Sequence, residues 1–226
     1  MMDFLISIDR ALLLAINDMH TAYMDNFMML FSGRWVWIPM YAAIFAAVLW
    51  RYGWRRGILL SLAVGLAVAI ADQTCASLLR PMAERLRPAN LENPLSSMVH
   101  IVDGYRGGRY GFPSCHAANT FVLAAAVAIL LRRCGVVAFV YAWALMTCYS
   151  RIYLGVHYPG DIIVGAIVGT GSALLCVLVV RHYTRAMVGP DIPERWRSLT
   201  PSRLVVGVGL AVIMVLAVVA AFLCAS

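Results

Sequence analysis

The stretch GILLSLAVGLAVAIADQTCASLL, residues 57–79, decides the fold class. It contains one charged residue, Asp72, and it is long enough to cross the apolar core of a bilayer, which needs about 20 mainly apolar residues. Similar segments occur along the rest of the chain, and the six candidate spans cover roughly residues 31–50, 57–79, 114–131, 134–150, 161–180 and 204–225. We therefore expect an all-α, polytopic membrane protein, a bundle of six transmembrane helices.

The composition supports the same class. Of the 226 residues, 62% are hydrophobic and 13% are charged, whereas soluble domains have about 45–50% apolar and about 25% charged residues. This balance excludes a disordered chain, a coiled coil and an ordinary soluble enzyme. The length suits a single integral-membrane domain over residues 1–226, with the six-helix bundle over residues 31–226.

Residues 1–30 differ from the candidate spans. Apolar residues such as Phe4, Ile8 and Leu12 recur at helical spacing, but Asp3 and Asp9 interrupt them. This pattern is typical of a helix that lies in the membrane interface. The segment has neither a basic leader nor a small-residue cleavage site, so we do not expect a cleaved signal peptide.

The arginines indicate the orientation. All 18 basic residues are Arg, and the net charge is +7. They concentrate in the links 51–56, 132–133 and 181–203, which the positive-inside tendency places in the cytoplasm. Segments 80–113 and 151–160 then lie outside. In so apolar a chain, the excess charge indicates cytoplasmic loops or an anionic substrate rather than a nucleic acid.

Three polar motifs lie at the outer ends of the predicted spans. The first runs from Arg80 to Arg87-Pro88, and the second is Pro113-Ser114-Cys115-His116. The third is Ser150-Arg151, followed after five residues by His157 and after three more by Asp161. A helical bundle could bring the three motifs together.

These residue types suit chemistry on a phosphate group. Arginine forks onto phosphate oxygens and stabilises the charge of the transition state. Helix N-termini, expected near Ser114 and Asp161, direct free N–H groups at anions. Two histidines supply a nucleophile and a proton donor, and an aspartate four residues after His157 can orient its ring. The motifs therefore predict phosphoryl transfer.

We expect no metal and no other cofactor. No group of His, Asp, Glu or Cys has metal-ligand spacing, and the arginines supply the positive charge that a divalent ion would give. Most of the six cysteines lie inside apolar runs, so we interpret them as small buried hydrophobes rather than a disulfide framework.

The three motifs resemble those of the type 2 phosphatidic acid phosphatase superfamily of membrane lipid phosphatases. That family's pattern is K-x6-RP, then PSGH, then SR-x5-H-x3-D. This chain has R-x6-RP, PSCH and SR-x5-H-x3-D in the same order. The resemblance covers at least residues 57–180. It implies a six-helix bundle and metal-independent hydrolysis through a phosphohistidine intermediate.

The resemblance also implies a role for each motif residue. His157 is the nucleophile, Asp161 orients it, and His116 protonates the leaving oxygen. The remaining residues, which hold the phosphate, are Arg80, Arg87, Ser114 and Arg151.

Two residues depart from the family pattern, and three others need interpretation. Arg80 replaces the usual Lys, and Cys115 replaces the usual Gly, so the phosphate contact of Arg80 and the role of the Cys115 thiol stay open. Asp72 lies inside a predicted span, and we expect it to hold Arg80 or another site group from behind. Glu84 and Arg85 could join the site, but we interpret them as a solvated loop pair.

In chain length and in the residues around its second motif, the chain resembles bacterial members of the family that act on undecaprenyl pyrophosphate. We therefore expect a lipid phosphatase of the bacterial inner membrane with its site on the periplasmic or outer face. Alternatives within the family are a lipid A phosphatase, a phosphatidylglycerophosphate phosphatase and a lipid phosphotransferase. An anion or lipid transporter is an alternative of another class. The sequence does not determine the oligomeric state.

Overall fold

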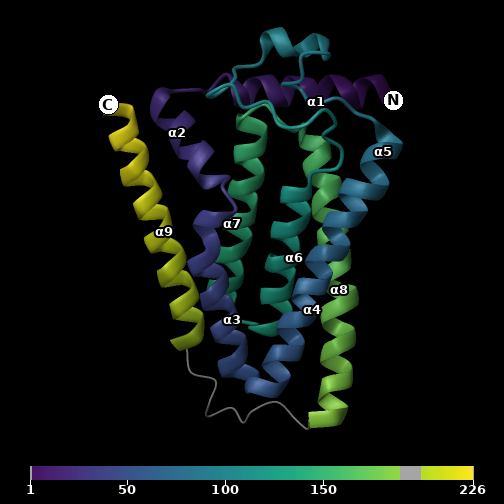
Figure 1. The fold of residues 1–226 in the computed structure, drawn as a ribbon, viewed down its shortest axis with the longest axis vertical. Coiled ribbons are helices and arrows are strands. Elements are labelled where there is room, and N and C mark those ends of the chain that lie inside the picture. Colours follow the sequence, from purple (N-terminus) through teal and green to yellow (C-terminus); the bar gives the residue numbers. More distant parts are fainter. Residues whose placement is uncertain (1, 189–199, 226) are drawn as a thin grey trace.

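The computed structural model describes residues 2–188 and 200–225, and in these residues the regular structure is helical (Figure 1). The α-helices are α1 (Met2–Asn17), α2 (Ala22–Phe31), α3 (Ile38–Tyr52), α4 (Trp54–Gln73), α5 (Arg80–Ala83), α6 (Cys115–Leu130), α7 (Cys134–Tyr153), α8 (Pro159–Val188) and α9 (Thr200–Ala225). Short 3-10 turns, Trp35–Trp37 and Pro94–Met98, and a π-helical turn, Thr74–Leu79, complete the regular structure of the described residues.

The chain is an all-α, multi-pass membrane protein. Five helical stretches are long and apolar enough to cross a membrane: Trp35–Tyr52, Trp54–Ala83, Cys134–Tyr153, Pro159–Arg185 and Pro201–Ala225. The remaining predicted span corresponds to α6, which is apolar but has only 16 residues. A helix of that length is slightly short for a bilayer core, which takes about 17–25 residues.

Helix α8 packs closely against α6 because two of its glycines face that helix. A Cβ added at Gly165 would collide with the backbone of Ser114, and one added at Gly169 would collide with the backbone of Ala118. Small residues four apart allow helix backbones to approach closely in membranes. The close packing brings the beginning of α8 next to the beginning of α6.

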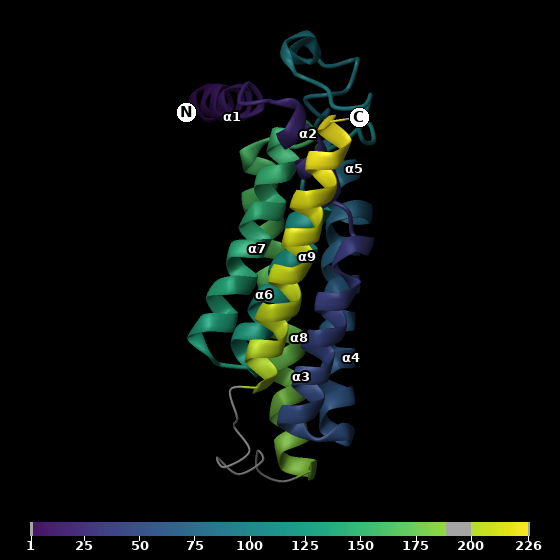
Figure 2. The same cartoon turned by 90° about the vertical axis from the view of Figure 1, so that its left-hand side faces the viewer.

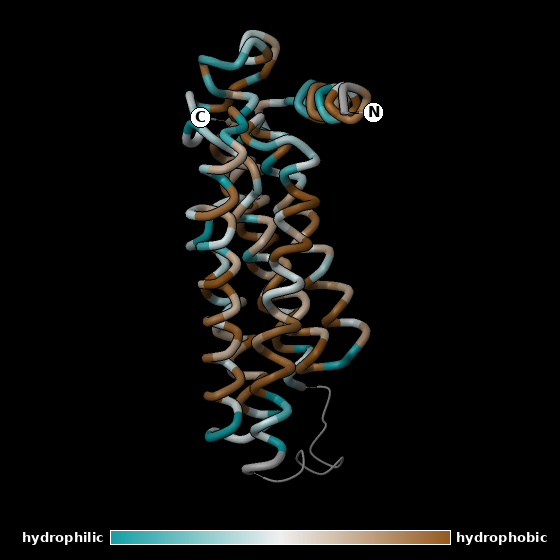
Figure 3. The backbone as a smooth tube through the Cα atoms, turned by 90° about the vertical axis from the view of Figure 1, so that its right-hand side faces the viewer, coloured by the Kyte–Doolittle hydropathy of each residue, from teal (hydrophilic) through white to brown (hydrophobic). Residues whose placement is uncertain are grey.

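The polar motifs and the arginine-rich links lie at opposite ends of the bundle. The α3–α4 and α6–α7 links lie at one end, and residues 84–114 and the α7–α8 link lie at the other (Figures 1 and 2). Apolar residues line the length of the helices, and hydrophilic residues gather towards both ends (Figure 3). Arg195 and Arg197, which the orientation argument used, lie outside the described residues.

Residues 1–30 form two helices rather than one. Helix α1 lies across the motif end of the bundle (Figure 2), with Leu13 fully buried and Phe4 and Leu5 exposed. Thr21 begins α2, because its hydroxyl accepts a hydrogen bond from the Met24 N–H. Helix α2 runs into the bundle beside α9 (Figure 1).

A π-helical turn precedes the first motif. Pro81 has no N–H with which to continue an α-helical hydrogen-bond ladder, and the N–H of Arg80 donates to the carbonyl of Cys75, five residues back. Such turns are frequent at functional sites. Helix α5 then ends at Glu84, whose φ of 44° turns the chain into the loop that carries Arg87.

Candidate active site

The second and third motifs meet where α6 and α8 begin. The backbone N–H of Ser114 donates to the carbonyl oxygen of Asp161 at 3.0 Å. His116, in the first turn of α6, lies within electrostatic range of His157 and Arg151. The structure therefore brings together both histidines and the motif arginines that the sequence singled out.

His157 and Asp161 are adjacent and buried, each with a side chain that is 1% exposed. The separation between His157 Nδ1 and Asp161 Oδ2 is 3.4 Å. The same carboxylate oxygen accepts a hydrogen bond from the Tyr158 N–H at 3.0 Å, across the first turn of α8. The aspartate therefore caps the chain where α8 begins and faces the imidazole.

The first motif reaches His157 through Arg87. Nη1 of Arg87 lies 3.1 Å from Nε2 of His157 and also donates to the Val156 carbonyl, while Nε donates to the Tyr110 carbonyl. Because a guanidinium can only donate hydrogen bonds, Nε2 must be the unprotonated nitrogen of a neutral ring. The proton then sits on Nδ1, on the side of Asp161, and the lone pair of Nε2 faces the arginine.

The electrostatics of the site favour this neutral ring. Burial, reinforced by the charges of Arg87, Arg151 and Arg80, holds the pKa of His157 well below its usual value of 6.5. Burial and the neighbouring arginines also lower the pKa of Arg87 from 12.5 to about 10. A cluster of cations that disfavour one another's charge is stabilised by an anion.

A short antiparallel pairing aims two arginines at the site. Leu86 and Tyr110 form a bridge, the Arg87 N–H donates to the Arg109 carbonyl, and the Gly111 N–H donates to the Arg85 carbonyl. Side chains alternate along an extended segment, so Arg85 and Arg87 point to the same side. A Cβ on Gly111 would lie 3.1 Å from Arg87 Cγ and 3.2 Å from Asp161 Oδ2, so any larger residue here would have to displace these side chains.

Arg85 contacts Asp161, so it joins the candidate site instead of forming the solvated loop pair that the sequence favoured. Its Nη1 donates to Asp161 Oδ1 at 2.8 Å, and its Nη2 pairs with Asp9 of α1. The sequence carried one signal, the two-residue interval between Arg85 and Arg87, which places both on one face of an extended segment. The partner Asp9 lies too far away in the chain for any spacing to reveal it.

The other predicted phosphate ligands surround this centre. Arg151 is 2% exposed, and its Nη2 donates to the Tyr105 hydroxyl at 2.7 Å. Ser114 is fully buried and caps α6, since its hydroxyl accepts a hydrogen bond from the Ala117 N–H. Tyr105, from the glycine-rich loop before α6, carried no distinguishing signal in the sequence.

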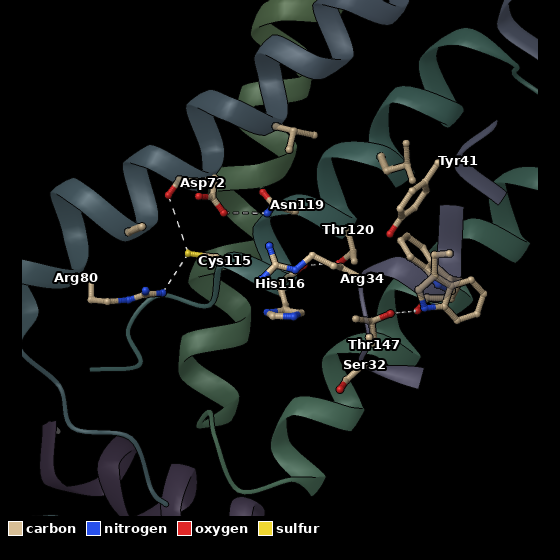
Figure 4. Close-up of a pocket in the computed structure, with 16 residues that line it drawn as sticks. Ser32, Arg34, Tyr41, Asp72, Arg80, Cys115, His116, Asn119, Thr120 and Thr147 are labelled. Carbon is tan, nitrogen blue, oxygen red and sulfur yellow. Dashed lines mark hydrogen bonds between the residues drawn. The ribbon is translucent and has the colours of Figure 1, made fainter. Parts of the chain in front are cut away.

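Cys115 connects Arg80 to the backbone of α4. Arg80 Nη2 donates to Cys115 Sγ at 3.0 Å and to the Pro113 carbonyl at 3.1 Å. The thiol in turn lies 4.0 Å from the Asp72 carbonyl oxygen. The Asp72 carboxylate was expected to hold Arg80 or another site group from behind, and it accepts a hydrogen bond from Asn119 at 2.9 Å (Figure 4).

A cavity of about 570 Å³ adjoins these groups on the side of His116 (Figure 4). Its polar end carries Arg80, His116 and Arg34, and the side chain of Arg34 points towards His116. The lining residues, drawn from the described part of the chain, do not include His157. They are Ser32, Gly33, Arg34, Trp37, Tyr41, Val68, Asp72, Ala76, Arg80, Cys115, His116, Asn119, Thr120, Leu123, Trp143 and Thr147.

Comparison with known sequences identifies one family. The PAP2 superfamily profile matches residues 56–185. The chain is 40% identical to a lipid A 4′-phosphatase of Bacteroides thetaiotaomicron, over 93% of this chain and 94% of that protein. It is 30% identical to a lipid A 4′-phosphatase of Porphyromonas gingivalis, over 80% and 73%. An undecaprenyl-diphosphatase of Sulfolobus acidocaldarius is 32% identical, over only 42% and 43%.

Solved structures share the fold. Aquifex aeolicus LpxE superposes with a TM-score of 0.55 at 24% identity, over 76% of this chain and 94% of that chain. A transmembrane PAP2-type phosphatidylglycerolphosphate phosphatase from Bacillus subtilis gives a TM-score of 0.54 at 21% identity, over 81% and 87%. At these identities the likeness concerns the fold.

Proposed function

The chain belongs to the PAP2 superfamily and is a membrane lipid phosphatase, and from this premise we propose that it removes the 4′-phosphate of lipid A. The family assignment confirms the resemblance inferred from the three motifs. The catalytic part of the proposal rests on the contact between Arg87 and His157 Nε2. This contact requires an unprotonated Nε2, whose lone pair points towards the arginines that would bind the phosphate. The proposal for the substrate depends on the relatives.

The sequence favoured undecaprenyl pyrophosphate, and the similarities favour one of its alternatives instead. Two lipid A 4′-phosphatases match most of the chain, whereas the undecaprenyl-diphosphatase matches less than half of it. Motif residues cannot separate these substrates, because both carry a phosphate and require the same chemistry. The difference must lie in residues that contact the rest of the lipid.

The proposed reaction proceeds in two steps. His157 Nε2 attacks phosphorus while the bond to the leaving oxygen breaks, and His116 gives that oxygen a proton. Asp161 stabilises the positive charge that develops on the His157 ring. Water then attacks the phosphorus of the phosphohistidine while the bond to His157 Nε2 breaks, and His116 takes the proton of the water, which releases phosphate and the neutral His157 ring. The arginines of the site, Arg80, Arg87 and Arg151, stabilise the phosphoryl oxygens through both steps.

The cavity beside His116 suits the leaving group of this reaction. In-line displacement places the leaving oxygen opposite the nucleophile, on the side of the general acid, and the cavity adjoins His116. Its walls combine the rings of Trp37 and Trp143 with polar groups of Arg34 and Asp72. Such a lining can hold the sugar of lipid A, with the aromatic rings against its apolar face and the Arg34 guanidinium as a hydrogen-bond donor to its oxygens.

The orientation of the site is also part of the proposal. The motifs and the links that carry Arg51, Arg55, Arg132 and Arg133 lie at opposite ends of the bundle (Figure 1). The positive-inside tendency assigns these links to the cytoplasm. The site then faces the outer side of a bacterial inner membrane, where it would act on lipid in the outer leaflet.

A substrate panel tests the proposal. Purified protein in detergent with EDTA is given lipid A that carries the 4′-phosphate, lipid A that carries only the 1-phosphate, undecaprenyl pyrophosphate, phosphatidylglycerophosphate and phosphatidic acid. We expect kcat/KM for the 4′-phosphate to exceed the others by about tenfold or more, because a site built for polar contacts rejects substrates that lack them. Mass spectrometry of the lipid product identifies the position that lost its phosphate.

The same panel decides among the alternatives. A preference for undecaprenyl pyrophosphate or phosphatidylglycerophosphate would replace the substrate but keep the enzyme class. Transfer of phosphate to an added lipid acceptor would indicate a phosphotransferase. A transporter would instead release no phosphate from any lipid of the panel. The same protein, reconstituted into vesicles, would take up anions. Activity that EDTA abolishes and magnesium restores would contradict the metal-free mechanism.

A further inference from the structure

Asp161 has two carboxylate oxygens, and each contacts a different partner. Oδ2 faces His157 and the Tyr158 N–H, whereas Oδ1 accepts a hydrogen bond from Arg85 at 2.8 Å. The carboxylate is 1% exposed. A buried anion whose cationic partner is removed is left with uncompensated charge. Arg85 holds one oxygen and the Tyr158 N–H holds the other, and together they fix the carboxylate that faces the imidazole.

Arg85 is itself held by helix α1. Its Nη2 pairs with Asp9 Oδ2, and Asp9 Oδ1 accepts a hydrogen bond from the Gly160 N–H at 2.7 Å. The guanidinium also lies over the ring of Tyr158, with its carbon 4.0 Å from the ring centre. Contacts on the flat face and on two of its nitrogens restrict the guanidinium to one position. Asp9 thus joins α1 to the first turn of α8, where an anion is also favoured by the helix dipole.

We propose that Arg85 is a positioning residue for the reaction, and that Asp9 on helix α1 holds it in place. The chain Asp9–Arg85–Asp161–His157 connects the helix that crosses the end of the bundle to the nucleophile. Of these four residues, only Asp161 and His157 occupy defined positions of the three motifs. Arg85 is one of the unspecified residues of the first motif, and Asp9 lies outside all three. The inference rests on the proposed function, because it requires that His157 act as the nucleophile and Asp161 orient it.

Loss of one partner from an ordinary surface ion pair would have a smaller effect than loss of Arg85. Exposed pairs contribute about 0–1 kcal/mol and tolerate loss of one partner. Arg109 and Glu92 form such a pair in the same loop, with side chains that are 59% and 56% exposed. Arg85, at 28%, pairs with carboxylates that are 13% and 1% exposed. Arg109→Gln is therefore a matched control for Arg85→Gln.

Steady-state kinetics on the preferred lipid test the proposal, with Arg85→Gln, Arg85→Lys, Asp9→Asn and the control Arg109→Gln. We expect Arg85→Gln to lower kcat by about tenfold or more with little change in KM, since a small misplacement of a reacting group costs up to about a hundredfold. Arg85→Lys should restore part of kcat, because it returns the charge without the fork. Asp9→Asn should lower kcat less, and Arg109→Gln should leave kcat and KM unchanged.

A double-mutant cycle separates positioning from general stabilisation. In an Asp161→Asn background, measured in single turnovers at high enzyme concentration, Arg85→Gln should cause no additional loss, because its partner is already neutral. Additive losses, a loss confined to KM, or an unchanged kcat in Arg85→Gln would overturn the proposal. If Arg85→Gln fails to fold, Arg85→Lys and Asp9→Asn decide it by the same criteria. Failure of the proposed function is distinguishable, because it would show as an inactive wild type or an active His157→Ala variant.

Discussion

The backbone N–H of Ser114 donates to the backbone carbonyl of Asp161 at 3.0 Å, so the first turns of α6 and α8 are joined by the main chain. Side-chain substitution at either position leaves this bond available. The geometry that brings the second and third motifs together therefore does not depend on the reactive groups. Catalytic side chains can be changed one at a time, and a loss of rate can be attributed to chemistry.

Asp161→Asn should reduce kcat strongly and leave the fold intact. The amide has almost the shape of the carboxylate, but it has no charge with which to stabilise the imidazolium that forms on His157. The corresponding change in a serine protease triad lowers kcat by about ten-thousandfold. We expect a loss of about a hundredfold or more, with little change in KM. The measurements are phosphate release and size-exclusion chromatography in detergent. A variant with wild-type kcat would exclude an orienting role for Asp161.

The His157 ring should remain neutral at pH values where an ordinary histidine is protonated. Its pKa lies well below 6.5 because of burial and the charges of Arg87, Arg151 and Arg80. As pH falls through 6.5 the free nucleophile therefore persists, and it is lost only when pH reaches the lowered pKa. NMR of ¹⁵N-histidine-labelled protein, with the signal assigned by its loss in His157→Gln, measures the titration.

An anion should reverse part of this shift. Vanadate places negative charge among the arginines, which favours protonation of the ring and raises the pKa of His157. The same NMR titration, repeated with saturating vanadate, should show a midpoint at higher pH than in its absence. A midpoint near 6.5 in the free protein would contradict the electrostatic description of the site.

Gly111→Ala should impair catalysis more than Gly108→Ala. A Cβ at Gly111 would lie within 3.5 Å of Arg87, Asp161 and His157, whereas a Cβ at Gly108 meets nothing within 4 Å. Neither change forces an unfavourable backbone, so the two differ mainly in what the methyl group touches. We expect about a tenfold or greater loss of kcat/KM for Gly111→Ala, and activity close to wild type for Gly108→Ala. Equal activities would show that the Arg85–Arg87 segment moves aside freely.

Arg34→Met should change substrate preference. The guanidinium of Arg34 points towards His116 in the cavity assigned to the leaving group (Figure 4), and methionine keeps much of the apolar stem without the donors. We expect kcat/KM for lipid A to fall by about tenfold, and that for undecaprenyl pyrophosphate to fall less. Arg10→Met, on the exposed face of α1, is the control. Equal losses on both lipids would assign Arg34 to phosphate binding rather than to selection of the lipid.

The sequence predicts the membrane fold and the motif residues because both depend on local patterns. Apolar runs identify the spans, and family spacing identifies residues such as His157 and Arg151. The helix ends were less predictable. Residues 57–79 were expected as one span, but the helical stretch continues to Ala83, because Pro81 is accommodated by a π-helical turn rather than by termination of the helix. Residues 1–30 form two helices because Thr21 caps the second.

Contacts between distant segments could not be read from the sequence. Asp9 and Arg85 are 76 residues apart, and only the packing of α1 across the bundle brings them together. Asp72 was expected to hold Arg80 or another site group, and the donor that reaches its carboxylate is Asn119 of α6, which the spacing of α4 does not reveal. Charge and periodicity identify which side chains need partners, and tertiary packing determines which partners they receive.

Because Leu86 pairs with Tyr110, the number of residues between Arg80 and Arg87 determines which side chains of this segment face the site. One residue inserted or deleted between Leu86 and Arg80 would shift every following side chain to the opposite face of the paired segment. Arg85 and Arg87 would then point away from the site, although no arginine had been lost. The length of this interval therefore matters as much as the residues at its ends, and a one-residue insertion or deletion there should abolish activity even with every arginine retained.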